Sequence, residues 1–368
     1  MLTKTRVQEF LKEIEVDDLV NNLQIMGEDV YIDMTAHSPA MHEKKKLEVA
    51  MKQAFASEFG EAVNLKLKIV SPEPTEVQQN QIKGKQIPGI KNIIAVASGK
   101  GGVGKSTVAA NMAVTLAKMG FKVGLLDADI YGPSVPTMLD TEGAKPVSVT
   151  VDGRNLMQPI ENYGVKMLSI GYFSGANQAV VWRGPMAAKA LNQMLRDAHW
   201  GELDFLLVDL PPGTGDIHLS IIQEVPVTGA VIVSTPQHVA LADVKKGIAM
   251  FQMESINIPV LGLVENMAYF TPEELPDNKY YIFGKEGAQF LAKDLGIPVL
   301  GEVPLIQSVR EAGDVGRPAA LQEGSRIEAV YQELTRNMVE SLVERNRNLP
   351  PTEAVKITTM AGCSSKKK

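Results

Sequence analysis

Runs of consecutive apolar residues recur along the chain from residue 92 onward, and helix-length segments separate most of them. These runs lie at 92–98, 122–127, 165–170, 205–209, 229–234, 259–265 and 299–303. A strand that is apolar at every position is buried on both faces, and strands of this kind that alternate with helices are typical of a parallel sheet between two helical layers. The pattern therefore predicts an α/β fold, in which ligands bind at the carboxyl ends of the strands. Four polar residues stand at such ends: Asp127, Asp209, Thr235 and Asn266.

The N-terminal residues follow a different pattern. We expect a hairpin with its turn at 27–29, a helix from about Glu43 to Phe59, and a strand from Val63 to Val70. These elements predict a small α+β domain over residues 1–70.

A polar segment follows this domain. Residues 71–91 contain three prolines and show no sustained period, which is typical of a linker. We expect the α/β domain over residues 92–345, with a last helix from about Glu323 to Arg345, and a disordered tail over 346–368. At 368 residues the chain exceeds the size at which single cores stop growing, which agrees with two domains.

Charge and apolar run length limit the classes of partner. The net charge of −6 gives no general attraction to nucleic acid or to acidic membranes. Residues 1–11 lack the apolar core of a signal peptide, and no run approaches the roughly 18 apolar residues of a membrane span. We therefore expect a cytoplasmic protein without nucleic-acid or membrane partners.

The most specific motif is a glycine-rich loop between the first of these strands and a helix at 106–119. Its glycines allow backbone N–H groups to converge on phosphate oxygens, and the helix N-terminus adds partial positive charge. Lys105 can reach the β- and γ-phosphates of a nucleotide, and Ser106 can ligate Mg²⁺. The residues expected to hold the nucleotide are Gly99, Lys100, Gly101, Gly102, Val103, Gly104, Lys105, Ser106 and Thr107.

The same loop also matches a dinucleotide-binding pattern. Gly99, Gly101 and Gly104 read as G-x-G-x-x-G, and Asp127 lies about 20 residues or slightly more beyond them, near where a ribose-binding acid would stand. Lys105 and Ser106, directly after the last glycine, favour the phosphate loop, because a dinucleotide site uses neither a phosphate-binding cation nor a metal ligand there.

Two further strands bring carboxylates to the edge of this site. Asp127 and Asp129 stand two residues apart at the end of one strand, and Asp209 ends another. One carboxylate can hold the water shell of Mg²⁺ while another orients the attacking water, because phosphoryl transfer depends on positioning and charge neutralisation. Each aspartate could instead cap a turn or a helix. We expect Ser106, Asp127 and Asp209 to form the Mg²⁺ site, directly or through water.

Several motifs together resemble one family. The loop GKGGVGKST, the strand LLDAD and the segment DLPPGTGD are similar to deviant-Walker ATPases related to MinD and ParA. Three further segments narrow the resemblance: DIYGPS at 129–134, WRGPM at 182–186, and ENM at 265–267 with IFG at 282–284. Together they resemble the Mrp/ApbC family of iron-sulfur cluster carrier ATPases over about residues 90–340. The N-terminal domain resembles the small SufT-like domain that is often fused to these proteins.

The resemblance implies a P-loop ATPase of slow turnover that works as a homodimer. Lys100 would be the signature lysine that crosses a two-fold interface to the partner's nucleotide, with a solvated surface lysine as the alternative. Lys105 would bind phosphate and Asp129 would position the hydrolytic water, which makes these three the catalytic residues. Asn266 would recognise adenine, and Pro304 begins a stretch that would border the base.

The sequence departs from the family where a cluster would bind. The family carries a C-x-x-C pair shortly after the ENM motif, but residues 269–276 read YFTPEELP. Carboxylates are poor ligands for an iron-sulfur cluster, which depends on cysteine thiolates. The N-terminal domain has methionine near 38–42, where its relatives commonly have cysteine.

Cys363 is the single cysteine and excludes a multi-cysteine metal site within one chain. It reads as a free tail thiol, although a dimer offers two copies. The five histidines, His37, His42, His199, His218 and His238, read as structural or exposed.

Two functions from different classes remain open. The first is a carrier that binds ATP, Mg²⁺ and a 4Fe-4S cluster and delivers the cluster to iron-sulfur apoprotein clients. The second is a metal-free switch or scaffold of the MinD/ParA kind that binds partner proteins. An oxidoreductase, from the dinucleotide pattern, is a third and weaker reading.

Overall fold

The computed structural model describes residues 3–350, apart from 15, 27–28, 36–40, 61–62, 71–86, 174–183, 273 and 276–277. Its contacts divide the chain into two compact units, 1–79 and 80–368. Two residues of the hairpin turn expected at 27–29, namely 27 and 28, lie outside the described residues, as do most of the linker and the tail beyond residue 350.

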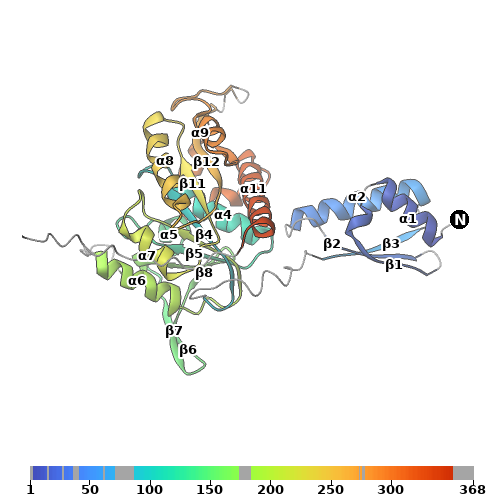
Figure 1. Ribbon diagram of the computed structural model, residues 1–368, viewed down its shortest axis with the longest axis horizontal. Coiled ribbons are helices and arrows are strands. Elements are labelled where there is room, and N and C mark those ends of the chain that lie inside the picture. The colour runs from blue at the N-terminus through green and yellow to red at the C-terminus, as the bar shows by residue number, and fades with distance from the viewer. Residues whose placement is uncertain are drawn as a thin grey trace, which may run out of the picture. The chain divides into compact units, whose positions relative to one another are not determined.

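The N-terminal unit packs two helices on a three-stranded sheet (Figure 1). Its elements are α1 (Lys4–Glu13), a 3-10 turn η1 (Asp17–Leu19), β1 (Val20–Met26), β2 (Asp29–Thr35), α2 (Met41–Phe59) and β3 (Asn64–Val70). β2 lies between β1, to which it is antiparallel, and β3, to which it is parallel. Alternate residues of β2, namely Val30, Ile32 and Met34, are buried in one cluster with Phe10 of α1 and Phe55 of α2. The helix α2 and the strand β3 correspond to the helix and the strand that we expect from the sequence.

The second unit contains an eight-stranded sheet in the order β13-β12-β11-β4-β10-β5-β9-β8. The strands are β4 (Ile90–Ser98), β5 (Val123–Asp127), β8 (Ile160–Asn162), β9 (Val165–Ser169), β10 (Leu203–Asp209), β11 (Gly229–Ser234), β12 (Val260–Phe270) and β13 (Val299–Leu305). All neighbours are parallel except β8, which pairs antiparallel to β9 at the edge. All seven apolar runs are strands of this sheet, so the predicted α/β fold is confirmed.

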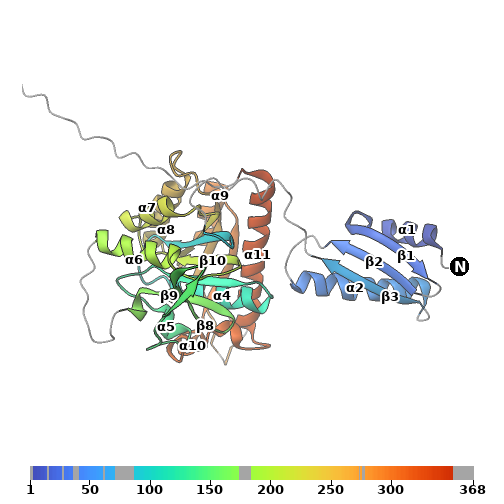
Figure 2. The same ribbon diagram turned by 90° about the horizontal axis from the view of Figure 1, so that it is seen from below.

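Helices cover both faces of the sheet (Figure 2). One face carries α4 (Lys105–Lys118), α5 (Val135–Met138), α10 (Gln307–Asp314) and α11 (Arg326–Asn348), which share one buried cluster. The other face carries α6 (Gly184–Arg196), α7 (Asp216–Glu224), α8 (His238–Gln252) and α9 (Gly287–Leu295). The remaining elements are the 3-10 turns η2 (Ile170–Tyr172) and η3 (Ala319–Leu321) and a projecting hairpin of β6 (Val147–Val151) and β7 (Arg154–Gln158).

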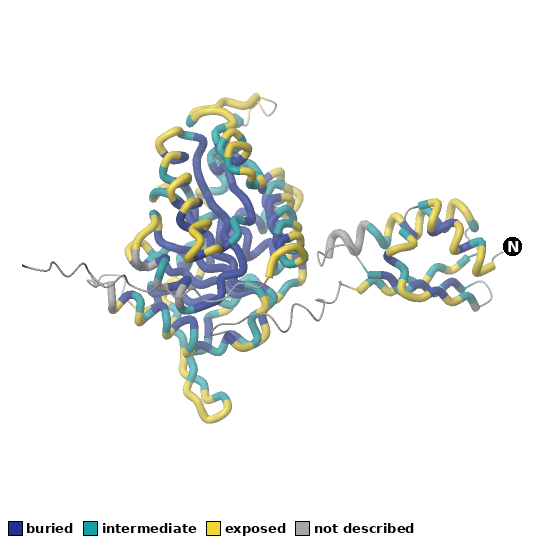
Figure 3. The backbone as a smooth tube through the Cα atoms, in the orientation of Figure 1, coloured by how far each residue is buried: buried dark blue, intermediate teal, exposed yellow. Residues whose placement is uncertain are grey.

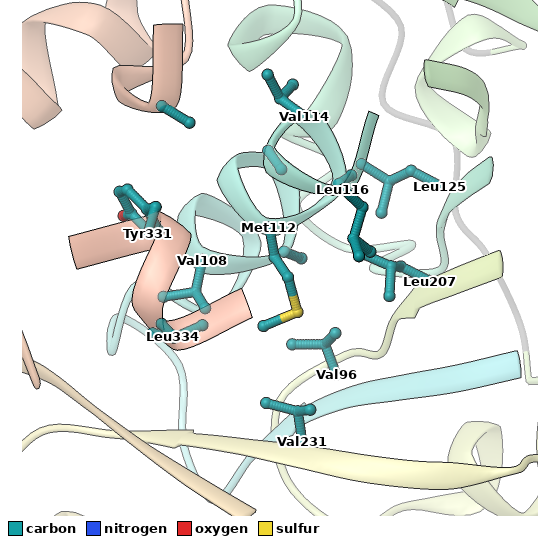
Figure 4. Packing of buried hydrophobic residues seen from close by; sticks show 14 of the residues in the cluster. Val96, Val108, Met112, Val114, Leu116, Leu125, Leu207, Val231, Tyr331 and Leu334 are labelled. Carbon is teal, nitrogen blue, oxygen red and sulfur yellow. The ribbon is translucent and has the colours of Figure 1, made fainter. Parts of the chain in front are cut away.

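The two cores result from the alternation of side chains along each strand. In β4, Ile93 and Ala95 belong to the cluster under α8, whereas Ile94 and Val96 belong to the cluster under α4. The central strands are therefore buried on both faces (Figure 3). Figure 4 shows Met112 of α4 packed toward the sheet. This double burial fixes the strand that leads into the glycine-rich loop.

The boundaries differ from expectation by a few residues. β4 begins at Ile90, inside the expected linker. The last helix begins after Ser325, whose side chain accepts a hydrogen bond from the Glu328 N–H, and it continues to Asn348, into the expected tail. Among the described residues, no helix has the length and apolar character that a membrane crossing needs.

Candidate nucleotide site

The glycine-rich loop joins the carboxyl end of β4 to the N-terminus of α4, as the sequence predicts. Gly102 and Gly104 have φ values of 79° and 80°, which residues with a side chain rarely adopt. A Cβ at Gly99 would lie 2.5 Å from the backbone nitrogen of Val244 in α8, and one at Gly104 would collide with the side chain of Asn266. Backbone conformation therefore favours glycine at 102 and 104, and close packing requires glycine at 99 and 104.

A pocket of about 180 Å³ opens beside this loop. The loop residues from Lys100 to Thr107 line it, together with Ser98, Asp129, Ser134, Met138 and Pro212. Backbone N–H groups of the first turn of α4 have no partner within the helix and can serve an anion. The pocket therefore brings together the loop, Lys105, Ser106 and Asp129, as expected from the sequence.

Lys105 is buried and lies among acidic groups. Its Nζ is 2.6 Å from Asp209 Oδ1 and 3.9 Å from Asp129 Oδ2. It also donates to Ser106 Oγ at 3.3 Å. One ammonium group thus faces two carboxylates and the hydroxyl that the sequence assigns to Mg²⁺.

Asp209 and Asp127 stand opposite each other at the carboxyl ends of β10 and β5. Both are fully buried, and burial is the main cause that raises the pKa of each carboxyl. The pKa of Asp127 rises to about 7 because the neighbouring charge of Asp209 adds to the effect of burial. The ion pair with Lys105 acts in the opposite direction and favours the ionised form of Asp209.

The two carboxylates differ in how their oxygens are used. Asp209 Oδ2 is buried and has no hydrogen-bond partner among the described residues. Asp127, in contrast, accepts from the Asp129 N–H at 3.1 Å, from the Val135 N–H at 3.3 Å and from Ser169 Oγ at 2.9 Å. Among the described residues, Asp209 therefore has one oxygen that accepts no hydrogen bond, whereas each oxygen of Asp127 accepts at least one.

The site fits a magnesium ion that is held mainly by phosphate and water. Mg²⁺ is commonly bound through one or two carboxylates plus phosphate oxygens, with several waters kept. Ser106 Oγ and the unpartnered Asp209 Oδ2 supply such oxygens. Within the described part of the chain there is no group of three or more His, Cys, Asp or Glu side chains that could hold a metal ion by themselves.

Lys100 lines the pocket, and its Nζ lies 3.3 Å from Gln237 Oε1, just before α8. Sequence reasoning missed Gln237, because the contact joins segments far apart in the chain.

Asn266 and Pro304 lie elsewhere. Asn266 Nδ2 donates to the carbonyl oxygen of Val103 at 2.8 Å, so that its amide supports the loop from behind. Neither Asn266 nor Pro304 is among the described residues that line the pocket. Their contact with adenine stays a prediction. The support of the loop by Asn266 was missed, and no local signal in the sequence reveals it.

His218 of α7 is buried, and neither ring nitrogen has a hydrogen-bond partner among the residues that the structure describes. Burial, aided by the charge of Lys105, lowers its pKa to about 4. Trp182, Arg183 and Cys363, which the sequence singled out, lie outside the described residues.

Comparison with known proteins identifies the family. The family model described as NUBPL iron-transfer P-loop NTPase matches residues 89–339. The chain belongs to this family. The resemblance found from the motifs is therefore confirmed.

Curated relatives and a solved structure agree with this family. The chain is 43% identical over 316 residues to the iron-sulfur cluster carrier protein of Synechocystis sp., covering 86% of this chain and 88% of that one. It is 53% identical over 246 residues to the iron-sulfur cluster carrier protein of Aquifex aeolicus, covering 66% of each. A nucleotide-binding protein of Archaeoglobus fulgidus, solved in complex with ADP, is 40% identical with a TM-score of 0.55 and covers 65% of this chain and 90% of that one.

Proposed function

We propose that this chain binds and slowly hydrolyses ATP with Mg²⁺, and that it acts as an iron-sulfur cluster carrier or assembly factor. The observation that carries the nucleotide part is the convergence of Lys105, Asp209 and Asp129 at a glycine loop that precedes a helix. The names of the relatives support the carrier part.

The residues divide the work of phosphoryl transfer. The N–H groups of the loop and Lys105 bind the phosphates, and Lys105 then exchanges its ion pair with Asp209 for phosphate oxygens. Ser106 and Asp209 would hold Mg²⁺, and the chemistry that this ion would supply is neutralisation of phosphate charge. Asp129, with its side chain at the pocket, orients the attacking water.

Lys100 supports a homodimer in which each subunit contacts the nucleotide of the other. Its position early in the loop suits contact with a phosphate of the partner subunit better than contact with its own nucleotide. The contact with Gln237 holds the lysine at the pocket. ATP would thereby control how two copies close and what they present to client apoproteins.

The cargo is tested by anaerobic reconstitution with iron and sulfide, followed by analysis of both elements. Because Cys363 is the only cysteine, two copies would supply one thiolate each to a shared cluster, and other groups would have to fill its remaining ligand positions. We expect iron and sulfide to be retained by the native chain and lost in Cys363→Ser. Absence of both elements from the native chain would contradict the carrier function.

The second candidate is a metal-free nucleotide switch that binds partner proteins. The sequence YFTPEELP at 269–276, with carboxylates in place of the C-x-x-C thiols, favours it. This candidate predicts normal ATP turnover with no bound iron or sulfide, and identical behaviour of Cys363→Ser.

A further inference from the structure

The carboxylate of Asp127 has three donors on two different segments. The Asp129 N–H lies at the start of the loop between β5 and α5, and the Val135 N–H lies at its end. Ser169 Oγ, at the end of β9, donates to the same oxygen as Val135. One side chain thus joins both ends of the loop 128–135 to the neighbouring strand.

This arrangement is buried and matched along the sheet. Asp209, Asp127 and Ser169 occupy aligned positions at the carboxyl ends of β10, β5 and β9. Asp127, Val135 and Ser169 are each 0% exposed. Hydrogen bonds to a carboxylate away from water are stronger than neutral ones and costly to leave unmade.

The 3-10 turn η2 packs closely against the other side of the loop 128–135. Ser169 Oγ also accepts from the Gly171 N–H at 3.0 Å, which places η2 against the loop. A Cβ at Gly171 would lie 3.4 Å from Pro133 and 3.3 Å from Pro136. The loop that carries Asp129 is therefore held on one side by Asp127 and on the other by η2.

We propose that Asp127 is a positioning residue that holds the loop 128–135 and so places the Asp129 carboxylate in the pocket, rather than a ligand of Mg²⁺. The contrast with Asp209, whose Oδ2 has no partner among the described residues, assigns the metal to Asp209 and the loop to Asp127. The inference rests on the proposed ATP hydrolysis, in which Asp129 orients water.

Kinetics of Asp127→Asn separate the two roles. The asparagine side chain has one oxygen, so it cannot accept hydrogen bonds from both the Asp129 N–H and the Val135 N–H as the two carboxylate oxygens do. We expect the loop to become more mobile and kcat to fall by about 10²-fold. The Mg²⁺ concentration for half-maximal rate should stay within about twofold, because no metal ligand is lost. A rise of about tenfold or more in that concentration, with kcat recovered at high Mg²⁺, would identify Asp127 as a metal ligand and overturn the proposal.

Ser169→Ala provides a second variant in case Asp127→Asn does not fold. It removes one donor to Asp127, and we expect a fall in kcat of about fivefold with an unchanged Mg²⁺ requirement. Thr115→Val is the matched control, because Thr115 is a buried hydroxyl in α4 that donates to the Asn111 carbonyl. A fall in Thr115→Val equal to that in Ser169→Ala would show a general loss of packing and contradict the proposal.

Amide hydrogen exchange tests the same contacts without any hydrolysis. We expect the peptide covering 128–135 to exchange about tenfold faster in Asp127→Asn and to be unchanged in Thr115→Val. Unchanged exchange in Asp127→Asn would overturn the role of Asp127. Failure of the native chain to hydrolyse ATP would instead refute the proposed function and leave the exchange result to stand by itself.

Discussion

Lys105 and Asp129 both line the pocket, with Nζ 3.9 Å from Oδ2, and the proposed function gives them different steps. Lys105→Ala removes the cation that binds phosphate, so we expect ATP affinity to fall by about 100-fold or more. Asp129→Ala should retain ATP binding and slow turnover by about 10²- to 10³-fold, because only the orientation of water is lost. Titration with a fluorescent ATP analogue and phosphate-release kinetics measure the two effects.

Lys91→Ala is the matched control for charge, since the Lys91 side chain is 58% exposed and pairs with Asp204 at the surface. Its binding and turnover should equal those of the native chain. Normal turnover in Asp129→Ala would contradict the role given to that carboxylate.

His218 makes the stability of the fold depend on pH. Its pKa is lowered to about 4 by burial, so the unfolded chain binds a proton at higher pH than the folded chain does. The stability that the neutral ring contributes is therefore present at pH 7 and is lost as pH falls through 6.5 toward about 4, by up to about 3 kcal/mol.

Urea unfolding at pH 7 and at pH 4.5 measures this loss in the native chain and in His218→Gln. We expect the loss to be smaller in His218→Gln, because glutamine does not titrate. The exposed His238, changed to Gln, should leave the pH dependence as it is in the native chain. The same pH dependence of the unfolding free energy in all three proteins would exclude His218 as its cause.

Among single residues, the sequence predicts those that belong to a short motif with fixed spacing. The loop, Lys105, Ser106 and Asp129 were found from local spacing and lie together in the pocket. The contacts of Asn266, Gln237 and Ser169 were not found, because each joins strands or loops whose proximity depends on the order of the sheet.

The packing of the loop between β4 and α4 depends on Gly104, and a comparison with Gly102 tests this dependence. Gly102 and Gly104 have nearly the same positive φ, but a Cβ would meet another residue, Asn266, only at Gly104. Alanine at either position adds backbone strain of about 1 kcal/mol or more, and Gly104→Ala adds a collision. We therefore expect Gly104→Ala to weaken ATP binding much more than Gly102→Ala.

Asn266→Ala offers the matched test of this collision, because it removes the obstructing amide. In the Gly104→Ala background it should restore part of the lost affinity, measured by the same titration. Equal effects of the two glycine substitutions, without any restoration, would contradict the packing explanation.

Strands and helices could be predicted where their burial leaves a pattern of apolar residues in the sequence. Strands that are buried on both faces are apolar throughout and were all found. β6, β7 and β8 were not found, since they are short and their residues are largely exposed or half-buried, so apolar residues do not mark them.

For the whole molecule, contacts divide the chain into units 1–79 and 80–368, and the family model matches residues 89–339 of the second unit. Composition and length predict two domains, and the resemblance implies that Lys100 crosses a two-fold interface to the partner's nucleotide, which a single copy of the chain does not test. Lys100→Ala should therefore retain ATP binding within about threefold and lose ATP-dependent association, because the cation serves the partner's phosphate. Size-exclusion chromatography with and without ATP separates it from Lys91→Ala, which should associate normally.

Sedimentation velocity of Asp129→Ala with MgATP tests the central claim most directly. Slow hydrolysis keeps ATP bound in this variant, so we expect it to sediment as a dimer with MgATP and as a monomer with MgADP. The same variant carrying Lys100→Ala should stay monomeric with either nucleotide. A monomer under every condition, with ATP bound at full occupancy, would contradict a nucleotide-closed dimer.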